Sequence, residues 1–379
     1  MFEEWYLNDL INERIKKSWK LCDLYLLTNL DGILKKTGIF ELLKNEISIN
    51  EIIIKCGYTD KVFYSIKWIF DRLGLDDYLL STPLNDTIVY KLTGKTYKRN
   101  VTEIFSEAMN LAPLTQSTFD LIKLVSENYP DYLEGKKNGV DILFNEESIN
   151  IMNEFYCINE FYAVHNIGGG TILNYDISQR NNPSILEIGG GMGGGTKQFI
   201  LQRIAGKQKL DNFTYIFTEV ANKLLRATKK EISEITNENI NISYKKFDFN
   251  TDPIEQGYEN NSFDVIWGVN ALHVAKDLKK SIKILYNMLK PGGSLLIAET
   301  VRADGNPMVQ QEFILNTLDS YWDVVLDEDI RPQYGFMHWK NWLKAFELAG
   351  FSNFETIPDM SEVEKKYDNC YVAMIRGIK

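Results

Sequence analysis

Residues 185–196, Ile-Leu-Glu-Ile-Gly-Gly-Gly-Met-Gly-Gly-Gly-Thr, decide the fold of this chain. The first four are apolar except for one glutamate, which predicts a short buried strand. Six glycines follow within seven positions, and the spaced apolar residues Phe199, Ile200 and Ile204 then predict a helix. A strand, a glycine turn and a helix form the first unit of a nucleotide-binding α/β sheet, where glycine lets the backbone approach a ligand closely.

The spacing of these glycines fits two kinds of nucleotide site. Gly189-x-Gly191-x-x-Gly194 is the dinucleotide-binding pattern, which on its own is a weak signal. With the acid before the glycines included, Glu187-x-Gly189-x-Gly191-x-Gly193 resembles motif I of the S-adenosylmethionine (SAM)-dependent methyltransferases. A glycine-rich surface loop would leave a glutamate inside an apolar strand unexplained. The resemblance implies SAM as the cofactor, held by Glu187 and the glycines at 189, 191 and 193.

The composition excludes several other classes of protein. At 379 residues the chain is long enough for two domains. Its four cysteines are far apart and its carboxylates form no ligand cluster, so we expect neither a disulfide framework nor a metal site. A net charge of -10 argues against a nucleic-acid partner and against anionic membrane. No apolar run approaches the ~20 residues that span a bilayer, so we expect a cytoplasmic protein.

The first hundred residues predict three helices and a hairpin, the elements of a winged helix. Residues 21–44 are amphipathic, and Ser48 is a candidate cap for a second helix. Asp60 is a candidate cap for a third helix, which Gly74 is expected to stop. Two β-rich segments, 78–80 and 88–92, then predict the hairpin.

A winged helix can bind DNA or join two copies of a chain. Here the third helix carries mixed charge and large apolar residues, which favours dimerisation. The segments 38–43 (Gly-Ile-Phe-Glu-Leu-Leu) and 72–75 (Arg-Leu-Gly-Leu) also resemble the N-terminal domain of small-molecule O-methyltransferases. That resemblance implies a homodimer.

Residues 101–175 predict a helical connector or lid between the N-terminal domain and the sheet. Within this region, residues 129–144 carry glycines and charges and predict a loop. We expect His165 to be a structural polar residue. An aromatic cluster is expected mostly to pack between domains, with one or two members over a substrate pocket: Phe155, Tyr156, Phe161 and Tyr162.

Residues 176–379 predict a doubly wound sheet with an acid at the end of its second strand. Glu219 ends the strand at 212–219, where such a sheet places the acid that binds ribose hydroxyls. Asp211 has the spacing of a nicotinamide enzyme but precedes the strand. In methyltransferases an acid after the third strand contacts the adenine amino group, and its neighbour packs on the ring. Asp248 and Phe249 match these positions.

The order of elements after the glycines resembles the methyltransferase domains of polyketide synthases over residues 130–350. The matching segments are 252–258, 270–278 and 289–293, the last being Leu-Lys-Pro-Gly-Gly. In that family a histidine and a glutamate form a catalytic dyad, and the matching residues are His273 and Glu299. Asn270, at the end of the strand before His273, is expected to contact the cofactor.

The expected fold is a Rossmann-like class I methyltransferase sheet with a helical or winged-helix N-terminal domain. We expect a dimerisation domain (1–100), a helical connector (101–175) and a SAM-binding domain (176–379), closed by antiparallel strands at 351–356 and 369–375.

Both O-methylation and C-methylation begin with removal of a proton, for which a neutral histidine near pH 7 is suited. Because a winged helix favours a free-standing enzyme of secondary metabolism, the sequence-based preference is methylation of a hydroxyl on a small-molecule or carrier-bound acceptor. The alternative is C-methylation of a carrier-bound β-ketoacyl chain. The glycine spacing leaves an NAD(P)-dependent oxidoreductase open, and the winged helix leaves a transcription regulator open.

Overall fold

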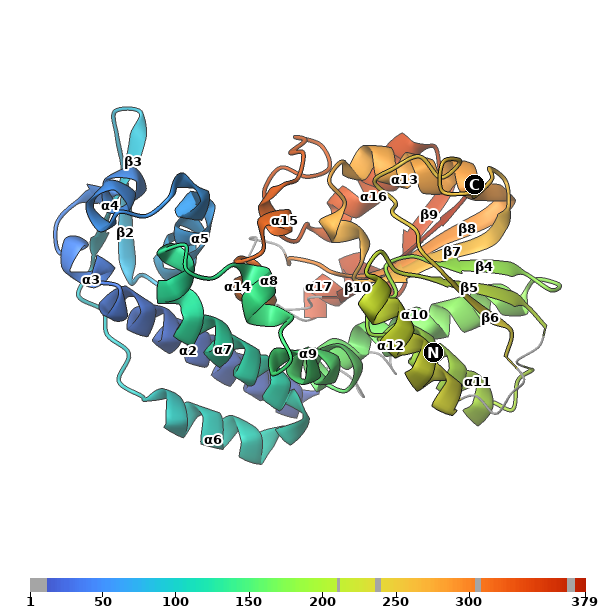
Figure 1. Ribbon diagram of the computed structural model, residues 1–379, viewed down its shortest axis with the longest axis horizontal. Coiled ribbons are helices and arrows are strands. Elements are labelled where there is room, and N and C mark those ends of the chain that lie inside the picture. Colours follow the sequence, from blue (N-terminus) through green and yellow to red (C-terminus); the bar gives the residue numbers. More distant parts are fainter. Residues whose placement is uncertain (1–11, 210–211, 236–239, 304–307, 367–371) are drawn as a thin grey trace.

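The computed structural model describes residues 12–209, 212–235, 240–303, 308–366 and 372–379. Figure 1 shows a helical N-terminal part beside a C-terminal part built on a large sheet. The N-terminal part comprises α2 (Glu13–Lys36), α3 (Ile39–Leu42), β1 (Ile47–Ser48), α4 (Ile49–Cys56), α5 (Phe63–Leu75), β2 (Leu79–Leu84), β3 (Thr87–Leu92), α6 (Val101–Leu111), α7 (Gln116–Leu133), α8 (Gly139–Leu143) and α9 (Ser148–Cys157).

Local signals explain most boundaries in this part. Ser48 caps α4 in a capping box with Glu51, as expected from the sequence. Asp60, however, does not cap α5; it begins a 3-10 turn that precedes the helix. Helix α5 ends at Leu75, one residue after the stop predicted at Gly74.

The predicted hairpin is confirmed. Strands β2 and β3 pair antiparallel, and β1 joins them in a three-stranded sheet of order β1-β3-β2. The identification of this part as a winged-helix dimerisation domain stays a prediction.

The predicted loop at 129–144 is wrong over most of its length. Helix α7 runs through Pro130 to Leu133, and Asn138 then caps the short helix α8 with Asp141. Tyr129 and Leu133 are both buried, so tertiary packing stabilises the last turn of α7 despite the proline.

The C-terminal part contains a seven-stranded sheet of order β6-β5-β4-β7-β8-β10-β9. The strands β4 to β8 are parallel, and β10 is antiparallel to both neighbours. This confirms the predicted Rossmann-like sheet and its closing antiparallel pair, although residues 369–371 and Asp211 lie outside the described residues. The bounds are β4 (Ser184–Glu187), β5 (Thr214–Thr218), β6 (Ile242–Lys245), β7 (Phe263–Val269), β8 (Leu289–Thr300), β9 (Asn353–Thr356) and β10 (Val372–Ile378).

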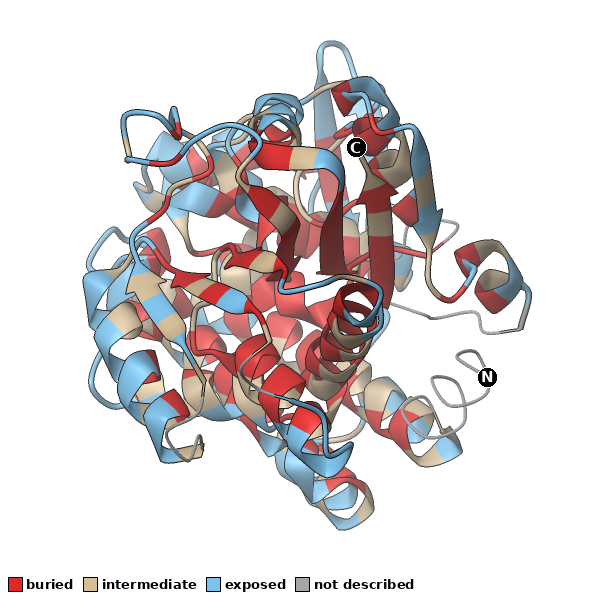
Figure 2. Cartoon of the chain, turned by 90° about the vertical axis from the view of Figure 1, so that its right-hand side faces the viewer, coloured by how far each residue is buried: buried red, intermediate tan, exposed pale blue. Residues whose placement is uncertain are grey.

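Helices cover both faces of this sheet, and its central strands are almost entirely buried (Figure 2). One face carries α10 (Glu160–Ser178), α11 (Gly194–Ala205) and α12 (Asn222–Ile235), and the other carries α13 (Leu278–Met288) and α16 (Trp339–Ala349). The remaining helices are α14 (Gln310–Leu315), α15 (Asp319–Trp322) and α17 (Met360–Lys366). Among the described residues, none of the helices has the length and apolarity that a membrane span requires.

A buried ion pair in the C-terminal part is hydrogen-bonded to the N-terminal part. Glu312 of α14 accepts hydrogen bonds from Arg302 Nε at 2.8 Å, from Phe336 N at 2.9 Å and, across the boundary, from Trp68 Nε1 of α5 at 3.1 Å. Glu312 is completely buried and Arg302 nearly so. The carboxylate therefore links the helical part, the end of the sheet and the segment after α15.

Candidate active site

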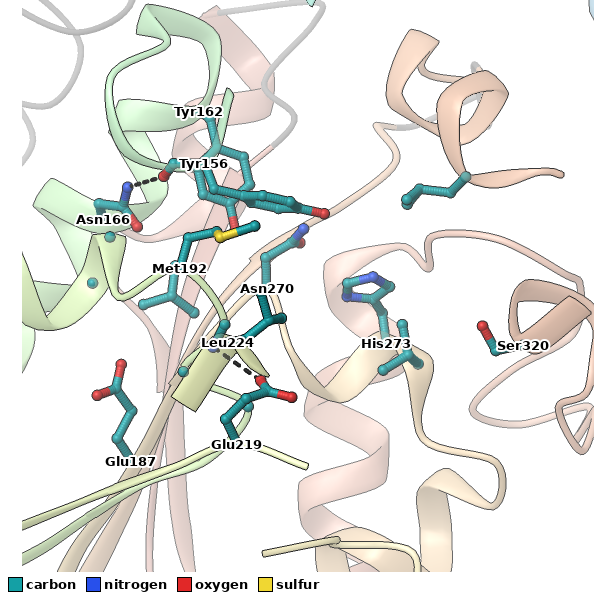
Figure 3. A pocket seen from close by; sticks show the side chains of 18 of the residues that line it. Tyr156, Tyr162, Asn166, Glu187, Met192, Glu219, Leu224, Asn270, His273 and Ser320 are labelled. Carbon is teal, nitrogen blue, oxygen red and sulfur yellow. Dashed lines mark hydrogen bonds between the residues drawn. The ribbon is translucent and has the colours of Figure 1, made fainter. Parts of the chain in front are cut away.

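A cavity of about 280 Å³ lies where the parallel strands β4, β5 and β7 end. The sheet contributes Glu187, the glycine loop, Glu219, Asn270 and His273 to its lining (Figure 3). The opposite wall comes from Phe144, which follows α8, from helices α9 and α10, and from the segment α14–α15, so both parts of the molecule enclose it. The cavity wall on that side is formed mainly by Phe144, Tyr156, Tyr162, Leu315 and Leu318.

The glycine loop lies flat against the sheet. Gly189, Gly191 and Gly193 have φ values of 56°, 52° and 74°, a conformation that other residues rarely adopt. A Cβ on Gly190 would lie 2.3 Å from ring atoms of Phe217. At Gly191 such an atom would meet no neighbour closer than 3.9 Å, so this glycine faces open space. The loop therefore packs closely against the sheet on one side, and on the other side its backbone is accessible from the cavity.

Glu187 is held beneath the loop by a buried hydrogen-bonded chain. Its Oε2 accepts from Thr196 Oγ1 and, at 2.7 Å, from Tyr215 Oη, which in turn accepts from Trp267 Nε1 at 3.0 Å. Glu187 is 1% exposed, and burial raises the pKa of its carboxyl group from 4.5 to about 7. The two hydrogen bonds oppose that shift.

The raised pKa predicts how stability depends on pH in the absence of a ligand. The folded state retains a proton on Glu187 between about pH 4.5 and 7, whereas the unfolded chain has released it, so unfolding becomes easier as pH rises through this window. At about 1.4 kcal/mol per pH unit, the penalty above pH 7 is roughly 3 kcal/mol. We expect Glu187→Gln, whose amide oxygen can accept the same two hydrogen bonds, to raise the free energy of unfolding at pH 8 but hardly at pH 4.5. Urea unfolding at both pH values checks this; equal effects would contradict it.

Glu219 and Asn270 mark the ends of β5 and β7. The carboxylate of Glu219 accepts from Gly191 N at 3.0 Å and from Ala221 N at 2.9 Å, so it ties the glycine loop to the neighbouring strand (Figure 3). Asn270 has φ 49°, and its Oδ1 accepts from Thr300 N at 2.9 Å. This left-handed residue turns the chain sharply, so that the following residues cross the end of β8.

The turn after Asn270 brings His273 and Glu299 together. His273 Nδ1 lies 3.0 Å from Glu299 Oε2, and Glu299 Oε1 accepts from Ala271 N and Leu272 N at 3.0 and 2.8 Å. Glu299 is completely buried behind His273, which is 8% exposed and lines the cavity. Because Nδ1 faces a carboxylate, Nε2 is the nitrogen that can take a proton from a molecule in the cavity.

Three of the predicted cofactor residues do not line this cavity. Gly193 lies where the loop enters α11, and Asp248 Oδ1 accepts from Asn250 N at 2.9 Å within its own turn. Phe249 is buried, with a ring atom 3.9 Å from the position of a Cβ on Gly189. Their roles at the adenine end of a ligand stay predictions.

Most of the cavity wall opposite the sheet was not predicted from the sequence. Of the aromatic cluster, Tyr156 and Tyr162 line the cavity, whereas Phe155 and Phe161 are buried in the N-terminal core. Nothing in the sequence indicated the segment around α14 and α15, because its spacing from the glycine loop carries no local signal. Its lining residues are Leu315, Leu318, Ser320 and Tyr321.

The two other histidines lie outside the cavity lining. His165 Nε2 is 2.9 Å from Thr300 Oγ1, and burial lowers its pKa to about 4, consistent with a neutral structural residue. His338 pairs with Glu364 at 2.9 Å and caps α16.

The comparisons with known proteins identify the domain. The family model described as a methyltransferase domain matches residues 186–295, which run from the glycine loop to the strand after Pro-Gly-Gly. The hybrid polyketide synthase–peptide synthetase iliA of Neonectria sp. is 25% identical over 325 residues, which are 86% of this chain. The chain spans 8% of the length of that relative.

Two solved structures share the fold over almost the whole chain. The CurJ carbon methyltransferase superposes with a TM-score of 0.83 at 18% identity, covering 98% of this chain and 95% of its own. The carbon methyltransferase domain of the citrinin polyketide synthase has a TM-score of 0.79 at 16% identity, covering 99% and 93%.

These findings correct the preference for hydroxyl methylation. The relatives are polyketide synthases, and the CurJ, citrinin synthase and DszA structures, which superpose with TM-scores of 0.83, 0.79 and 0.79, are carbon methyltransferases, so the preference for an O-methyltransferase is wrong. The helical N-terminal part, on which that preference depended, is matched in these structures together with the sheet domain. The chain carries a methyltransferase domain with the class I methyltransferase fold, and its relatives are the methyltransferase domains of polyketide synthases.

Proposed function

We propose that this chain transfers a methyl group from SAM to the α-carbon of a β-ketoacyl chain held as a thioester on a carrier protein. The observation that carries the proposal is the His273–Glu299 pair, at 3.0 Å, in a cavity that the glycine loop also lines. The similarity to carbon methyltransferases supports carbon as the acceptor atom.

The cavity fits SAM at its glycine end. Gly191 leaves the loop open toward the cavity, and the Glu219 carboxylate has lone pairs left for hydroxyl donors after accepting two main-chain N–H groups. We assign Glu219 to the ribose and the glycine loop, Glu187 and Asn270 to the remainder of the cofactor. When bound, SAM supplies the electrophilic methyl group and departs as S-adenosylhomocysteine.

The other end of the cavity fits an apolar acyl chain. Val274, Leu315 and Leu318 line the cavity together with His273. A carbon between two carbonyl groups is acidic enough for a histidine to deprotonate. His273 Nε2 takes the α-proton, the electron pair left on that carbon forms the new bond to the methyl group, and the methyl–sulfur bond breaks. Glu299 stabilises the imidazolium through Nδ1.

The test uses acetoacetyl-pantetheine and an acetoacetyl-loaded acyl carrier protein, each incubated with SAM and the enzyme. We expect the acyl group to gain the mass of one CH₂ unit, and proton NMR of the released product to place the methyl group on the α-carbon. A methyl group on oxygen, or no transfer to either thioester, would contradict the proposal.

We also propose that the chain is a cytoplasmic homodimer assembled through its N-terminal part. Exposed apolar side chains on and beside the β2–β3 hairpin, among them Leu75, Leu80 and Leu84, support this surface as an interface. Sedimentation velocity of the wild type and of Leu80→Asp/Leu84→Asp tests it, and a wild-type monomer would refute it.

A further inference from the structure

Arg331 is a buried cation directly behind the proposed catalytic turn. It is 1% exposed, and it follows α15 in a turn whose backbone bonds to Asp327 at 2.8 and 2.9 Å. Among the residues that the structure describes, no carboxylate forms an ion pair with it. Burial lowers its pKa to about 10, so the guanidinium stays charged at neutral pH. Burying a charge in this way is costly, and within the described residues the buried Nε of Arg331 has no hydrogen-bond partner.

The guanidinium binds the backbone that carries His273. Nη2 donates to the carbonyl of His273 at 2.9 Å, and Nη1 donates to the carbonyl of Ala275 at 2.6 Å. These are the carbonyls on either side of Val274, at the end of a 3-10 turn that spans residues 272–274. Such a short turn leaves its last carbonyl groups without partners of its own, and Arg331 satisfies two of them.

Glu299 holds the same turn from the other end. Its carboxylate accepts the N–H groups of Ala271 and Leu272 as well as His273 Nδ1. A buried anion thus binds the amino end of the turn and a buried cation binds its carbonyl end. The two opposite charges attract each other across the turn, and the attraction of Glu299 favours the charged form of Arg331.

We propose that Arg331 is a positioning residue for methyl transfer: its two-pronged guanidinium fixes the backbone of His273, so that the imidazole keeps its bond to Glu299 and presents Nε2 to the acceptor carbon. This inference depends on the proposed function for its kinetic test. Arginine suits the role because its planar fork reaches two carbonyls at once, which a lysine ammonium on a flexible stem does not do with the same rigidity.

The kinetic test compares Arg331→Lys and Arg331→Gln with the wild type, using acetoacetyl-pantetheine and SAM. We expect kcat to fall about 10²-fold in Arg331→Lys, because small errors in the position of a base cost that much. The KM for the thioester and the Kd for SAM, measured by calorimetry, should stay within about threefold, since Arg331 touches neither site. Arg331→Gln, which also loses the charge, should fall further.

Arg203→Lys is the matched control. Arg203 is also buried, and its guanidinium donates to the carbonyl of Lys209 and to the side chains of Asn174 and Asn212, at the end of α11. We expect its substitution to lower the melting temperature without changing kcat. An equal loss of kcat in Arg203→Lys and Arg331→Lys, or wild-type kcat in Arg331→Lys, would overturn the proposal.

A second measurement does not depend on activity. The chain has three histidines, so the imidazole ¹⁵N signals of His273 can be assigned with His165→Asn and His338→Asn variants. We expect the wild type to show one sharp His273 tautomer with the proton on Nδ1, and Arg331→Lys to show averaged or broadened signals. A His273 signal that is unchanged in Arg331→Lys would overturn the inference, even if the wild type transferred no methyl group. If the signals change as expected but the wild type transfers no methyl group, only the proposed function is refuted.

Discussion

Substitution of His273 by alanine is expected to lower the rate of methyl transfer about 10³-fold while SAM binding is retained. The imidazole is the titratable group that lines the cavity with a carboxylate behind it, and general-base catalysis contributes roughly 10²–10⁴-fold. SAM affinity should hold because the glycine loop and Glu219 are bonded to each other and not to His273. Stopped-time mass spectrometry of the acetoacetyl thioester and calorimetry with SAM give the two quantities.

His338→Ala is the control for this variant. His338 forms a histidine–glutamate pair of the same kind, 2.9 Å from Glu364, but it does not line the cavity. We expect it to leave the rate within about twofold of the wild type. Wild-type activity in His273→Ala would remove the pair from the mechanism, and equal losses in both variants would point to a general structural effect.

Substitution of Glu312 by alanine is expected to lower the free energy of unfolding by about 3–5 kcal/mol, the usual cost of leaving one partner of a buried ion pair. The variant removes the carboxylate that pairs with the buried Arg302, and it removes the acceptor of Phe336 N and Trp68 Nε1. Because Trp68 belongs to the helical part, we also expect the two parts to lose cooperativity. Urea unfolding followed by circular dichroism and by tryptophan fluorescence measures both effects.

Glu347→Ala is the matched control for the ion pair. Glu347 pairs with Lys344 at 2.7 Å on the surface of α16, where both side chains are about half exposed. Exposed pairs of this kind contribute at most about 1 kcal/mol. Comparable decreases in the free energy of unfolding in Glu312→Ala and Glu347→Ala would show that burial and the shared hydrogen bonds do not add to the stability that the Glu312 ion pair contributes.

Patterns within one or two elements could be predicted from the sequence. The strand, glycine loop and helix at 184–205 form where expected, and Ser48 caps α4, because these features depend on neighbours a few residues away. Helix ends set by distant packing were predicted poorly. Pro130 does not end α7, since the buried side chains beside it outweigh the local preference.

The choice of acceptor atom could not be made from the sequence motifs. A histidine paired with a glutamate can remove a proton from oxygen or from carbon. The dyad therefore does not distinguish O-methylation from C-methylation. The hydroxyl preference depended on the N-terminal part, and the match of that part to carbon methyltransferases along the whole chain reversed it.

The sequence by itself determined the order of the sheet elements and the residues at the strand ends, because a parallel sheet places Glu187, Glu219, Asn270 and Glu299 at one edge whatever surrounds them. Only the tertiary structure decided what encloses and supports that edge. Tyr156, Leu315 and Arg331 come from segments far from the glycine loop in the sequence, and no helix or strand periodicity relates them to it. Their positions depend on how helices pack and on which buried polar groups need partners, and such contacts form only when distant parts of the chain meet.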